Sequence, residues 1–250
     1  MKRISFLLCT VILAGFVSCR KDAAPNPGTG RSSEKTDQID IAEKLTSGKH
    51  TLEFSSPNRG SGQQDCLVNS IFPTSNLSSN PDLAASAWTY QGTFGIARDF
   101  FKFPGISYLP AGTTINAATL YFYGLAPGTA VANNTGNSFY PGSPYNPFGD
   151  NAGWVKRVTG PWEENTITWS NQPGTTSLNQ AGVAASTSQW DYNTTVNVTA
   201  LVQDIVNSGQ NYGFSLQQQV ESYYRNLNFA GHRHSDPARW PKLTITFTIP

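Results

Sequence analysis

Apolar and polar residues alternate in short runs along most of the chain after residue 48. In the clearest run, Leu243, Ile245, Phe247 and Ile249 alternate with three threonines and a final proline follows. Every second side chain of a β-strand lies on the same face, so this run predicts a strand with one buried face. Similar runs predict strands at residues 51–54, 67–72, 96–103, 113–123, 154–158, 166–169, 194–198, 212–216 and 227–229.

These strands are short and do not alternate with helices, which is typical of an all-β domain built from two packed antiparallel sheets. In the run at residues 166–169, we expect Ile167 and Trp169 to be buried between the sheets. One short helix is also expected: Thr199 can cap it, the apolar residues from Leu201 to Val206 have helical spacing, and Gly209 can end it.

Composition supports this fold and excludes one class of ligand. Of the 250 residues, 13% are charged and 12% are aromatic, with 22 glycines and 16 prolines. This mixture favours short strands and polar loops over a helical bundle or a coiled coil. The formal net charge of +1 provides no basic face for nucleic-acid phosphates, so we expect no nucleic-acid partner.

The first residues resemble a processing signal. Lys2 and Arg3 precede an apolar run that ends at Ser18-Cys19, as in the cleavage box of bacterial lipoproteins. We therefore expect a signal peptide at residues 1–18, a flexible tether at 19–48 whose Cys19 is lipidated, and a folded domain at 49–250. The alternative is an ordinary secretory peptide with an incidental cysteine.

Lipidation predicts a location in the bacterial cell envelope, as an outer-membrane lipoprotein. The polar residues 20–22 weakly resemble a surface-export tag, which leaves surface exposure as a further hypothesis. Once residues 1–18 are removed, Cys66 has only Cys19 as a fellow cysteine, so no intramolecular disulfide is expected with Cys19 lipidated. Cys66 is then expected to be a small buried apolar residue.

Residues 125–153 form an unusually long connection between predicted strands. The segment contains Tyr140, Tyr145 and Phe148 among several prolines and glycines. Long ordered loops within a compact domain are often functional, and prolines reduce the entropy that such a loop loses on binding. We therefore expect a ligand to contact this loop.

Several motifs resemble one known family. Residues 162–173 read WEENTITWSNQP, which is similar to the W-x-E-x-T-V-T-W-x-N-Q-P signature of the DNRLRE domain family, a family that includes carbohydrate-binding module family 96. Residues 109–120 and 198–203 resemble two further segments of that family. The sequence departs from the family pattern at Asn197 and at Trp240, which stand in place of Asp and Arg.

The resemblance implies a jelly-roll-type β-sandwich of secreted or surface proteins, some of which bind acidic polysaccharide. Aromatic rings can stack on sugar rings, and guanidinium groups can bind carboxylates in a bidentate manner. Trp88 and Tyr90 are among the aromatic residues weighed for such contacts, with core packing and ion pairing as the alternative roles. The candidate ligand-binding residues are Tyr140, Tyr145, Trp154, Arg157, Tyr223, Tyr224, Arg225 and Trp240.

Metal binding remains open in the sequence. His232 and His234 would share a face if they lay on a strand, and Asp236 could join them. Calcium would instead require oxygen ligands, such as those of Asp150 and Asn151, or of Asp65.

No catalytic residues and no cofactor are expected, because the sequence lacks a recognisable nucleophile, metalloprotease or phosphate-loop motif. The favoured hypothesis is a monomeric, lipid-anchored, non-catalytic module that binds a polysaccharide, acidic or neutral. A structural or adhesive surface protein is the first alternative. A carbohydrate-active enzyme is the weaker one.

Overall fold

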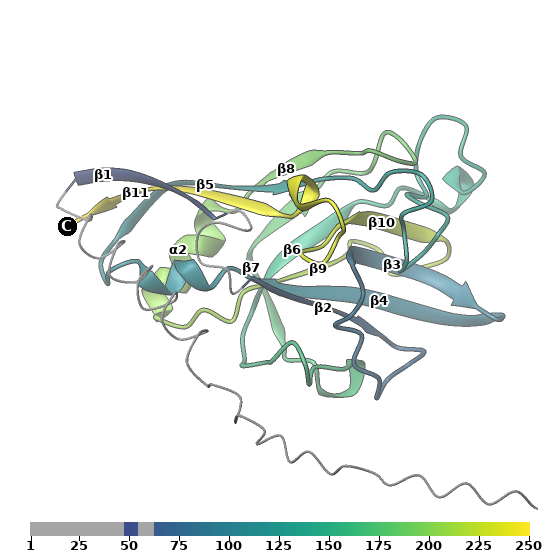
Figure 1. The fold of residues 1–250 in the computed structure, drawn as a ribbon, viewed down its shortest axis with the longest axis horizontal. Helices are drawn as coiled ribbons and strands as arrows, with labels where there is room; N and C mark the ends of the chain where they lie inside the picture. Colours follow the sequence, from purple (N-terminus) through teal and green to yellow (C-terminus); the bar gives the residue numbers. More distant parts are fainter. Residues whose placement is uncertain (1–47, 55–62) are drawn as a thin grey trace, which may run out of the picture.

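Two antiparallel β-sheets face each other in this protein (Figure 1). The computed structural model describes residues 48–54 and 63–250. The smaller sheet has the order β1-β11-β5-β8, with strands β1 (Gly48–Phe54), β11 (Lys242–Ile249), β5 (Thr114–Phe122) and β8 (Thr194–Asn197). The expected all-β fold of two antiparallel sheets with one short helix is confirmed, and it is consistent with a jelly-roll sandwich.

The larger sheet has the order β10-β3-β4-β9-β6-β7, and β2 also pairs with β4. Its strands are β10 (Arg225–Ala230), β3 (Asp82–Tyr90), β4 (Thr93–Lys102), β9 (Phe214–Gln218), β6 (Gly153–Val158), β7 (Thr175–Val183) and β2 (Gln64–Asn69). Four 3₁₀ turns complete the structure: η1 (Pro104–Tyr108), η2 (Asn146–Phe148), η3 (Trp169–Asn171) and η4 (Pro237–Arg239).

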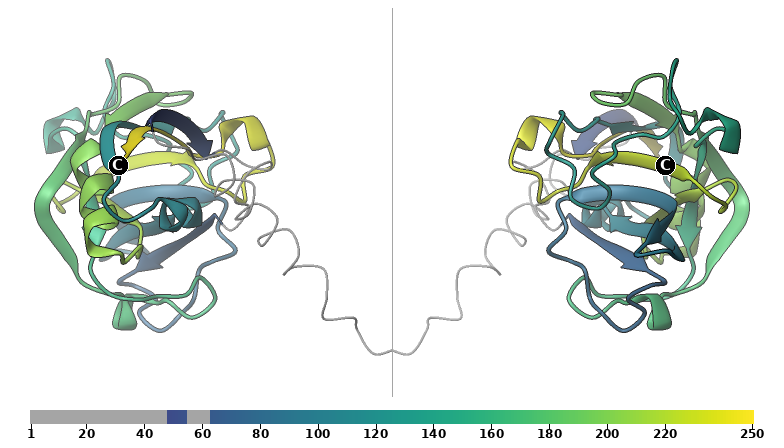
Figure 2. Two further views of the ribbon diagram at one scale, coloured as in Figure 1. Left: turned by 90° about the vertical axis from the view of Figure 1, so that its left-hand side faces the viewer. Right: turned by 90° about the vertical axis from the view of Figure 1, so that its right-hand side faces the viewer.

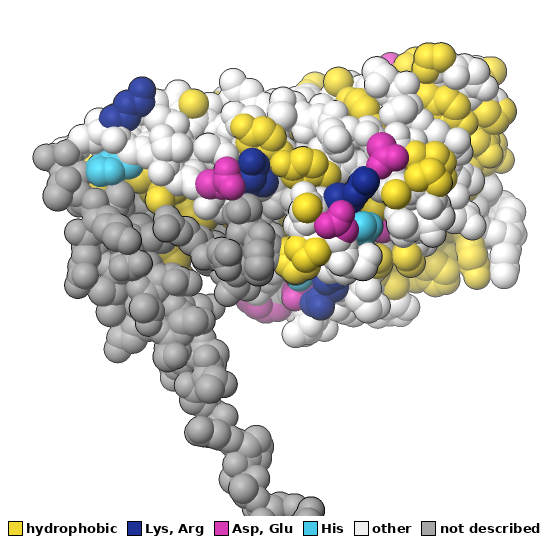
Figure 3. All heavy atoms as spheres, turned by 45° about the horizontal axis from the view of Figure 1, so that its top comes forward, with side chains coloured by type: hydrophobic (Ala, Val, Ile, Leu, Met, Phe, Trp, Pro, Cys, Tyr) yellow, Lys and Arg dark blue, Asp and Glu magenta, His cyan; other side chains and the backbone are white. Residues whose placement is uncertain are grey.

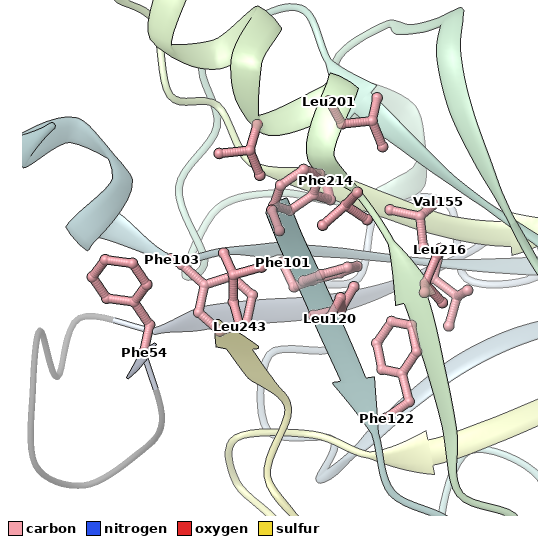
Figure 4. Packing of buried hydrophobic residues seen from close by; sticks show 14 of the residues in the cluster. Phe54, Phe101, Phe103, Leu120, Phe122, Val155, Leu201, Phe214, Leu216 and Leu243 are labelled. Carbon is pink, nitrogen blue, oxygen red and sulfur yellow. The ribbon is translucent and has the colours of Figure 1, made fainter. Parts of the chain in front are cut away.

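The main core fills the space between the sheets. Leu243, Ile245 and Phe247 of β11 are fully buried, as their alternation predicts. Figure 4 shows labelled side chains from both sheets pointing toward one another, including Leu120 of β5 and Phe214 of β9. Each Å² of apolar surface that is removed from water contributes about 25 cal/mol to stability, so this packed interface is the main source of stability.

The single helix of the described residues, α2 (Thr199–Ser208), packs against β5, and Figure 2 shows it beside the two sheets. Leu201 and Ile205 are buried against the core, and Gly209 ends the helix in the left-handed conformation with φ 64°. The prediction that Thr199 caps this helix is wrong. The N-cap residue is Val198, and the Thr199 hydroxyl accepts a hydrogen bond from the Ala118 amide of β5. No described helix is long and apolar enough to cross a membrane.

The signature motif does not form the expected strand. Thr168 and Asn171 make a capping box that turns the chain into η3, so residues 166–169 lie outside both sheets. Ile167 is buried as predicted, but Trp169 is only half-buried, with the Arg98 guanidinium 5.0 Å from its ring centroid. The tryptophan that is buried is Trp162, whose indole N–H donates to the Tyr212 carbonyl.

Two strands have no counterpart in the sequence prediction. β3 is buried on both faces from Asp82 to Ala87, and its side chains are mostly small, so it lacks the apolar–polar alternation of a half-buried strand. β7 is the opposite case, because most of its residues are at least partly exposed and few are apolar. Residues 1–47 lie outside the described part of the chain, so the predicted signal peptide, most of the tether and Cys19 stay predictions.

Candidate functional site

A cleft of about 660 Å³ lies over β3 and β4, on the face of these strands that points away from the main core. Small residues build most of its floor. Ser86 of β3 lies opposite Ala97 of β4, and Gly95 of β4 lies opposite Trp88 at the end of the floor. Ala84 continues the floor along β3. A volume of this size is typical of a small-molecule or oligomer site, and the missing side-chain bulk is what hollows the sheet surface.

One side of this cleft is aromatic. Trp88 and Tyr90 project from the end of β3, and Phe72 lies in the turn after β2. The rings of Phe72 and Tyr90 meet edge to face with centroids 5.4 Å apart. Phe72 is 38% exposed and Tyr90 is 51% exposed, so both rings keep apolar surface available to a ligand.

The other side of the cleft is the segment 130–135 of the long loop between β5 and β6. Asp82 fixes this segment, because its Oδ2 accepts hydrogen bonds from the amides of Val131 (2.5 Å) and Ala132 (2.7 Å). Asn133, Asn134 and Thr135 also line the cleft, where the Thr135 hydroxyl donates to Asn133 Oδ1 at 2.6 Å.

Buried asparagines of β10 hold the rest of the long loop. The Asn226 side-chain amide donates to the Gly136 carbonyl at 2.6 Å, and the Asn228 amide side chain donates to the Asn133 carbonyl at 3.1 Å. In return, the Ser138 hydroxyl accepts from the Asn226 backbone N–H. These bonds order the loop before any ligand binds, which lowers the entropy cost of binding.

An aromatic cluster continues from the cleft. Its members are Trp88, Tyr145, Phe148, Tyr224, Tyr223 and Phe94. The Trp88 ring meets Tyr145 with centroids 4.6 Å apart and Tyr224 at 4.9 Å, so one tryptophan belongs to both the cleft and the cluster.

Exposed apolar side chains gather at this end of the molecule. Seven large apolar residues are exposed in the described structure, and five of them belong to the cleft or to the aromatic cluster: Phe72, Tyr90, Val131, Phe148 and Tyr223. Figure 3 shows hydrophobic side chains gathered at the right-hand end, with most charged side chains of that face nearer its middle and left. A concentrated apolar surface of this kind marks a binding site.

The structure brings together four of the eight candidate ligand residues. Tyr145, Tyr223 and Tyr224 belong to the aromatic cluster, and Arg225 is the residue after Tyr224 in the sequence. However, the Arg225 Nε donates to the Asp150 carbonyl at 2.8 Å, and its Nη1 contacts the Ser222 hydroxyl. Arg225 therefore ties the long loop to β10.

None of the eight candidates lines the cleft, and the other four also lie outside the aromatic cluster. Tyr140 contributes its carbonyl to the loop's internal bonds, accepting from the Asn146 side chain. Trp154 lies on β6 opposite Gly182 of β7, and Arg157 lies further along β6. The Trp240 indole donates to the His234 carbonyl at 2.6 Å, so the aromatic residue that departs from the family pattern joins a structural contact.

The two histidines of the predicted metal cluster point to different partners, because residues 232–235 form a turn and no strand. His232 lies between two carboxylates, with Nδ1 2.9 Å from Asp65 and Nε2 3.3 Å from Glu164. Arg233 also pairs with Glu164, at 2.9 Å. Within the described residues, Asp65, Glu164 and His232 are the one group close enough to share a metal ion, and the Arg233 guanidinium already occupies Glu164 Oε1.

The calcium hypothesis based on Asp150 and Asn151 is not supported by their contacts. The Asp150 carboxylate accepts from the Ala152 amide at 3.1 Å, and the Asp150 carbonyl accepts from the Arg225 guanidinium at 2.8 Å. The Asn151 side chain is fully buried and bonds to Ser186 and to the Asn226 carbonyl. Both residues therefore support the loop.

Ionisable groups behind the cleft are strongly perturbed. Burial, followed by repulsion from Asp65, holds the pKa of Asp99 well above its ordinary value, and burial also raises the pKa of Asp82. Cys66 is buried, as expected, and burial raises the pKa of its thiol to about 12.

The sequence predicts ligand contact for the 125–153 loop, which contains segment 133–135, but it does not predict the rest of the cleft. Phe72, Trp88 and Tyr90 are absent from the predicted ligand-binding residues, although Trp88 and Tyr90 are among the aromatic residues that the sequence offers for such contacts. The available signal was the run of small residues before Trp88, which could have indicated a strand with a hollow face.

A comparison with known families finds a match to part of the chain. Carbohydrate-binding module family 96 matches residues 145–247, a range that contains the aromatic cluster residues Tyr145, Phe148, Tyr223 and Tyr224. The floor of the cleft and segment 130–135 precede the matched range. No curated protein matches the chain.

Proposed function

Because residues 145–247 match the model of carbohydrate-binding module family 96, we propose that this protein holds a polysaccharide without cleaving it. We propose the cleft over β3 and β4 as the binding site. The observation that carries the proposal is the pairing of exposed aromatic rings with ordered polar groups across one cleft. Tyr90 and Phe72 offer ring surface to the C–H groups of a sugar, and residues 133–135 offer hydrogen-bonding groups to its hydroxyls.

The aromatic cluster extends this surface along the molecule. A polysaccharide is longer than the cleft, so its neighbouring rings can rest on Tyr223 and Phe148, which are 45% and 42% exposed. The ordered loop and packed rings leave little freedom to lose, which suits a module whose only task is to bind.

The proposal also includes attachment to the bacterial cell envelope. Cys19 after the apolar run would carry the acyl chains, and residues 20–48 would separate the folded part from the membrane. In this arrangement the protein, as a monomer, retains polysaccharide at the outer membrane.

The Tyr90→Ala variant tests the binding site. In a chain kept soluble by Cys19→Ala, we expect Tyr90→Ala to weaken binding to a polysaccharide on a glycan array about 5-fold or more, by analogy with base–aromatic stacking, which contributes about 1–3 kcal/mol per base. The melting temperature should stay nearly constant, since half of this side chain is already exposed (51%).

The matched control is Leu178→Ala. Leu178 is 61% exposed on β7, away from the cleft lining, and its removal should leave binding intact. Equal binding by Tyr90→Ala and Leu178→Ala would move the site away from this cleft. Failure of the parent chain to bind any polysaccharide would refute the function itself.

A further inference from the structure

We propose that the start of β2 and the turn at residues 232–235 hold one divalent metal ion between them, bound by the side chains of Gln63, Gln64, Asp65 and His232. The ion belongs to the transition-metal class that includes Zn²⁺. These residues line neither the cleft nor the aromatic cluster, so the inference does not rest on the proposed function.

A small cavity lies where these two segments meet. Its volume is about 10 Å³, which is about the smallest space that holds one water-sized occupant. The four proposed ligands line it, together with Lys102. The side chain of Asp65 is 3% exposed and that of His232 is 15% exposed, so an ion in this cavity would be largely shielded from solvent.

The polar atoms of this lining are short of donors. In the described structure, four buried side-chain atoms of the lining have no hydrogen-bond partner: Gln63 Oε1, Gln64 Oε1, Asp65 Oδ1 and His232 Nδ1. The Gln63 amide is oriented by its other atom, since Nε2 donates to the Pro241 carbonyl at 3.1 Å. The three oxygens only accept hydrogen bonds, and one water has just two hydrogens to donate. A cation satisfies all of these atoms at once.

Two of the four atoms have the separation of ligands that share an ion. Asp65 Oδ1 and His232 Nδ1 lie 2.9 Å apart, yet they do not form a hydrogen bond with each other. Two ligands that are each about 2.1 Å from one ion lie about 3 Å apart. The second Asp65 oxygen accepts from the His232 backbone N–H at 2.7 Å, which fixes the carboxylate relative to the ring.

The opposite nitrogen of the His232 ring has the neighbour that is typical of a metal-bound histidine. Nε2 lies 3.3 Å from Glu164 Oε1, and a carboxylate in this position favours the tautomer that leaves the Nδ1 lone pair free. Glu164 also pairs with Arg233, at 2.9 Å, so its role is to orient the ring. The Lys102 ammonium has partners of its own, because it donates to the Trp162 carbonyl and lies 4.7 Å from the Trp162 ring centroid.

The donor set selects the class of ion. An imidazole nitrogen suits Zn²⁺ and its neighbours in the first transition row, whereas Ca²⁺ and Mg²⁺ take oxygen ligands. For one set of nitrogen and oxygen ligands, Zn²⁺ binds more tightly than Mn²⁺. An ion bound here would fasten the turn at residues 232–235 to β2.

Isothermal titration calorimetry with Zn²⁺ tests the site. The full chain carries Cys9→Ala and Cys19→Ala, which remove the thiols outside the described residues. We expect one Zn²⁺ per chain, at least 10-fold weaker binding of Mn²⁺, and a melting temperature that rises in excess Zn²⁺, because a ligand of the folded state stabilises it. Absence of Zn²⁺ binding, or Ca²⁺ binding as tight as that of Zn²⁺, would overturn the inference.

Two variants locate the ion. Asp65→Asn and His232→Gln should each weaken Zn²⁺ binding at least 10-fold and abolish the rise in melting temperature. His50→Gln is the matched control, because His50 lies on β1 outside the cavity lining, and it should change neither quantity. Zn²⁺ affinity equal to the parent's in a folded Asp65→Asn or His232→Gln chain would show that the ion binds elsewhere. Circular dichroism identifies a variant that does not fold, and the titration of the parent chain with the three ions then decides the inference.

Discussion

Asp99 is an acid placed where an ordinary strand would carry an apolar residue. It is fully buried on β4, its Oδ2 accepts from the Ala84 amide, and its Oδ1 has no hydrogen-bond partner among the described residues. The β4 ladder passes from β3 at Ala97 to β9 at Asp99, so this side chain supplies an acceptor where the backbone ladder changes partner. The buried Ala84 N–H gains a hydrogen-bond acceptor, but the Asp99 carboxyl group loses its hydration, which destabilises its charged form.

This cost predicts the effect of Asp99→Asn. Since the pKa of Asp99 is raised in the folded protein, the folded state binds a proton that the unfolded state does not, and this residue's contribution to stability rises as the pH falls through the raised pKa. The gain levels off below the ordinary pKa near 3.8. Asn keeps the acceptor for Ala84 without the charge, so the variant should be more stable than the parent by about 1 kcal/mol or more at pH 7.

Urea unfolding of both chains at pH 7 and pH 5 measures this difference. The advantage of the Asn variant should shrink at the lower pH. An advantage that grows on acidification would contradict the assigned direction of the pKa shift. Asp204→Asn is a suitable control, because Asp204 lies on α2 and its carboxylate accepts a hydrogen bond between exposed groups.

At the scale of elements, the long loop acts as a cover for the edge strand β10. An edge strand exposes unpaired backbone groups, and here Ser138 N–H donates to the Asn226 carbonyl while Asn226 N–H donates to the Ser138 hydroxyl. The same bonds position segment 130–135 as the wall of the cleft. The hydrogen bonds between the long loop and β10 therefore cover the edge strand and also hold the wall of the cleft.

The Asn226→Ala variant tests this coupling. It removes the donor to the Gly136 carbonyl and leaves that buried group unpaired, which should cost about 1–3 kcal/mol of stability. Because the loop also forms the cleft wall, hydrogen exchange at residues 133–138 should speed up and polysaccharide binding should weaken. Asn116→Ala, at an exposed side-chain contact on β5, should change none of these quantities. Unchanged hydrogen exchange at residues 133–138 in a folded Asn226→Ala chain would show that the Asn226 side chain does not order the loop.

At the scale of the whole molecule, the prediction concerns attachment. Cys19→Ala should move the protein from the membrane fraction to the soluble fraction, because the acyl chains proposed on Cys19 would anchor it to the membrane. Fractionation and immunoblotting of cells that express each form measure the shift. The Cys66→Ala variant is the control, since Cys66 is buried. Membrane retention of the Cys19→Ala form would end the lipoprotein hypothesis.

Local sequence determined several elements correctly. The alternation in residues 243–249 fixes which face of β11 is buried, and the apolar spacing before Gly209 fixes the length of α2. These features depend on the period of side chains along one element, so they can be inferred without knowing the neighbours. The burial of Cys66 was likewise expected and confirmed.

Tertiary structure decided the site. The small side chain of Ala84 on β3 is buried beside Leu67 and Ala132, and nothing in the sequence of β3 itself indicates these neighbours. Trp169 is half-buried instead of buried, and Trp162 is the buried tryptophan of the motif, since η3 turns residues 166–169 out of the sheet. Most of all, Phe72, Trp88 and the segment 130–135 are far apart in the chain and meet at one cleft only when the strands pair. The sequence by itself determined the fold class and the supply of aromatic rings; which rings face a ligand depends on long-range pairing, because contacts between distant segments leave no periodic signal in either segment.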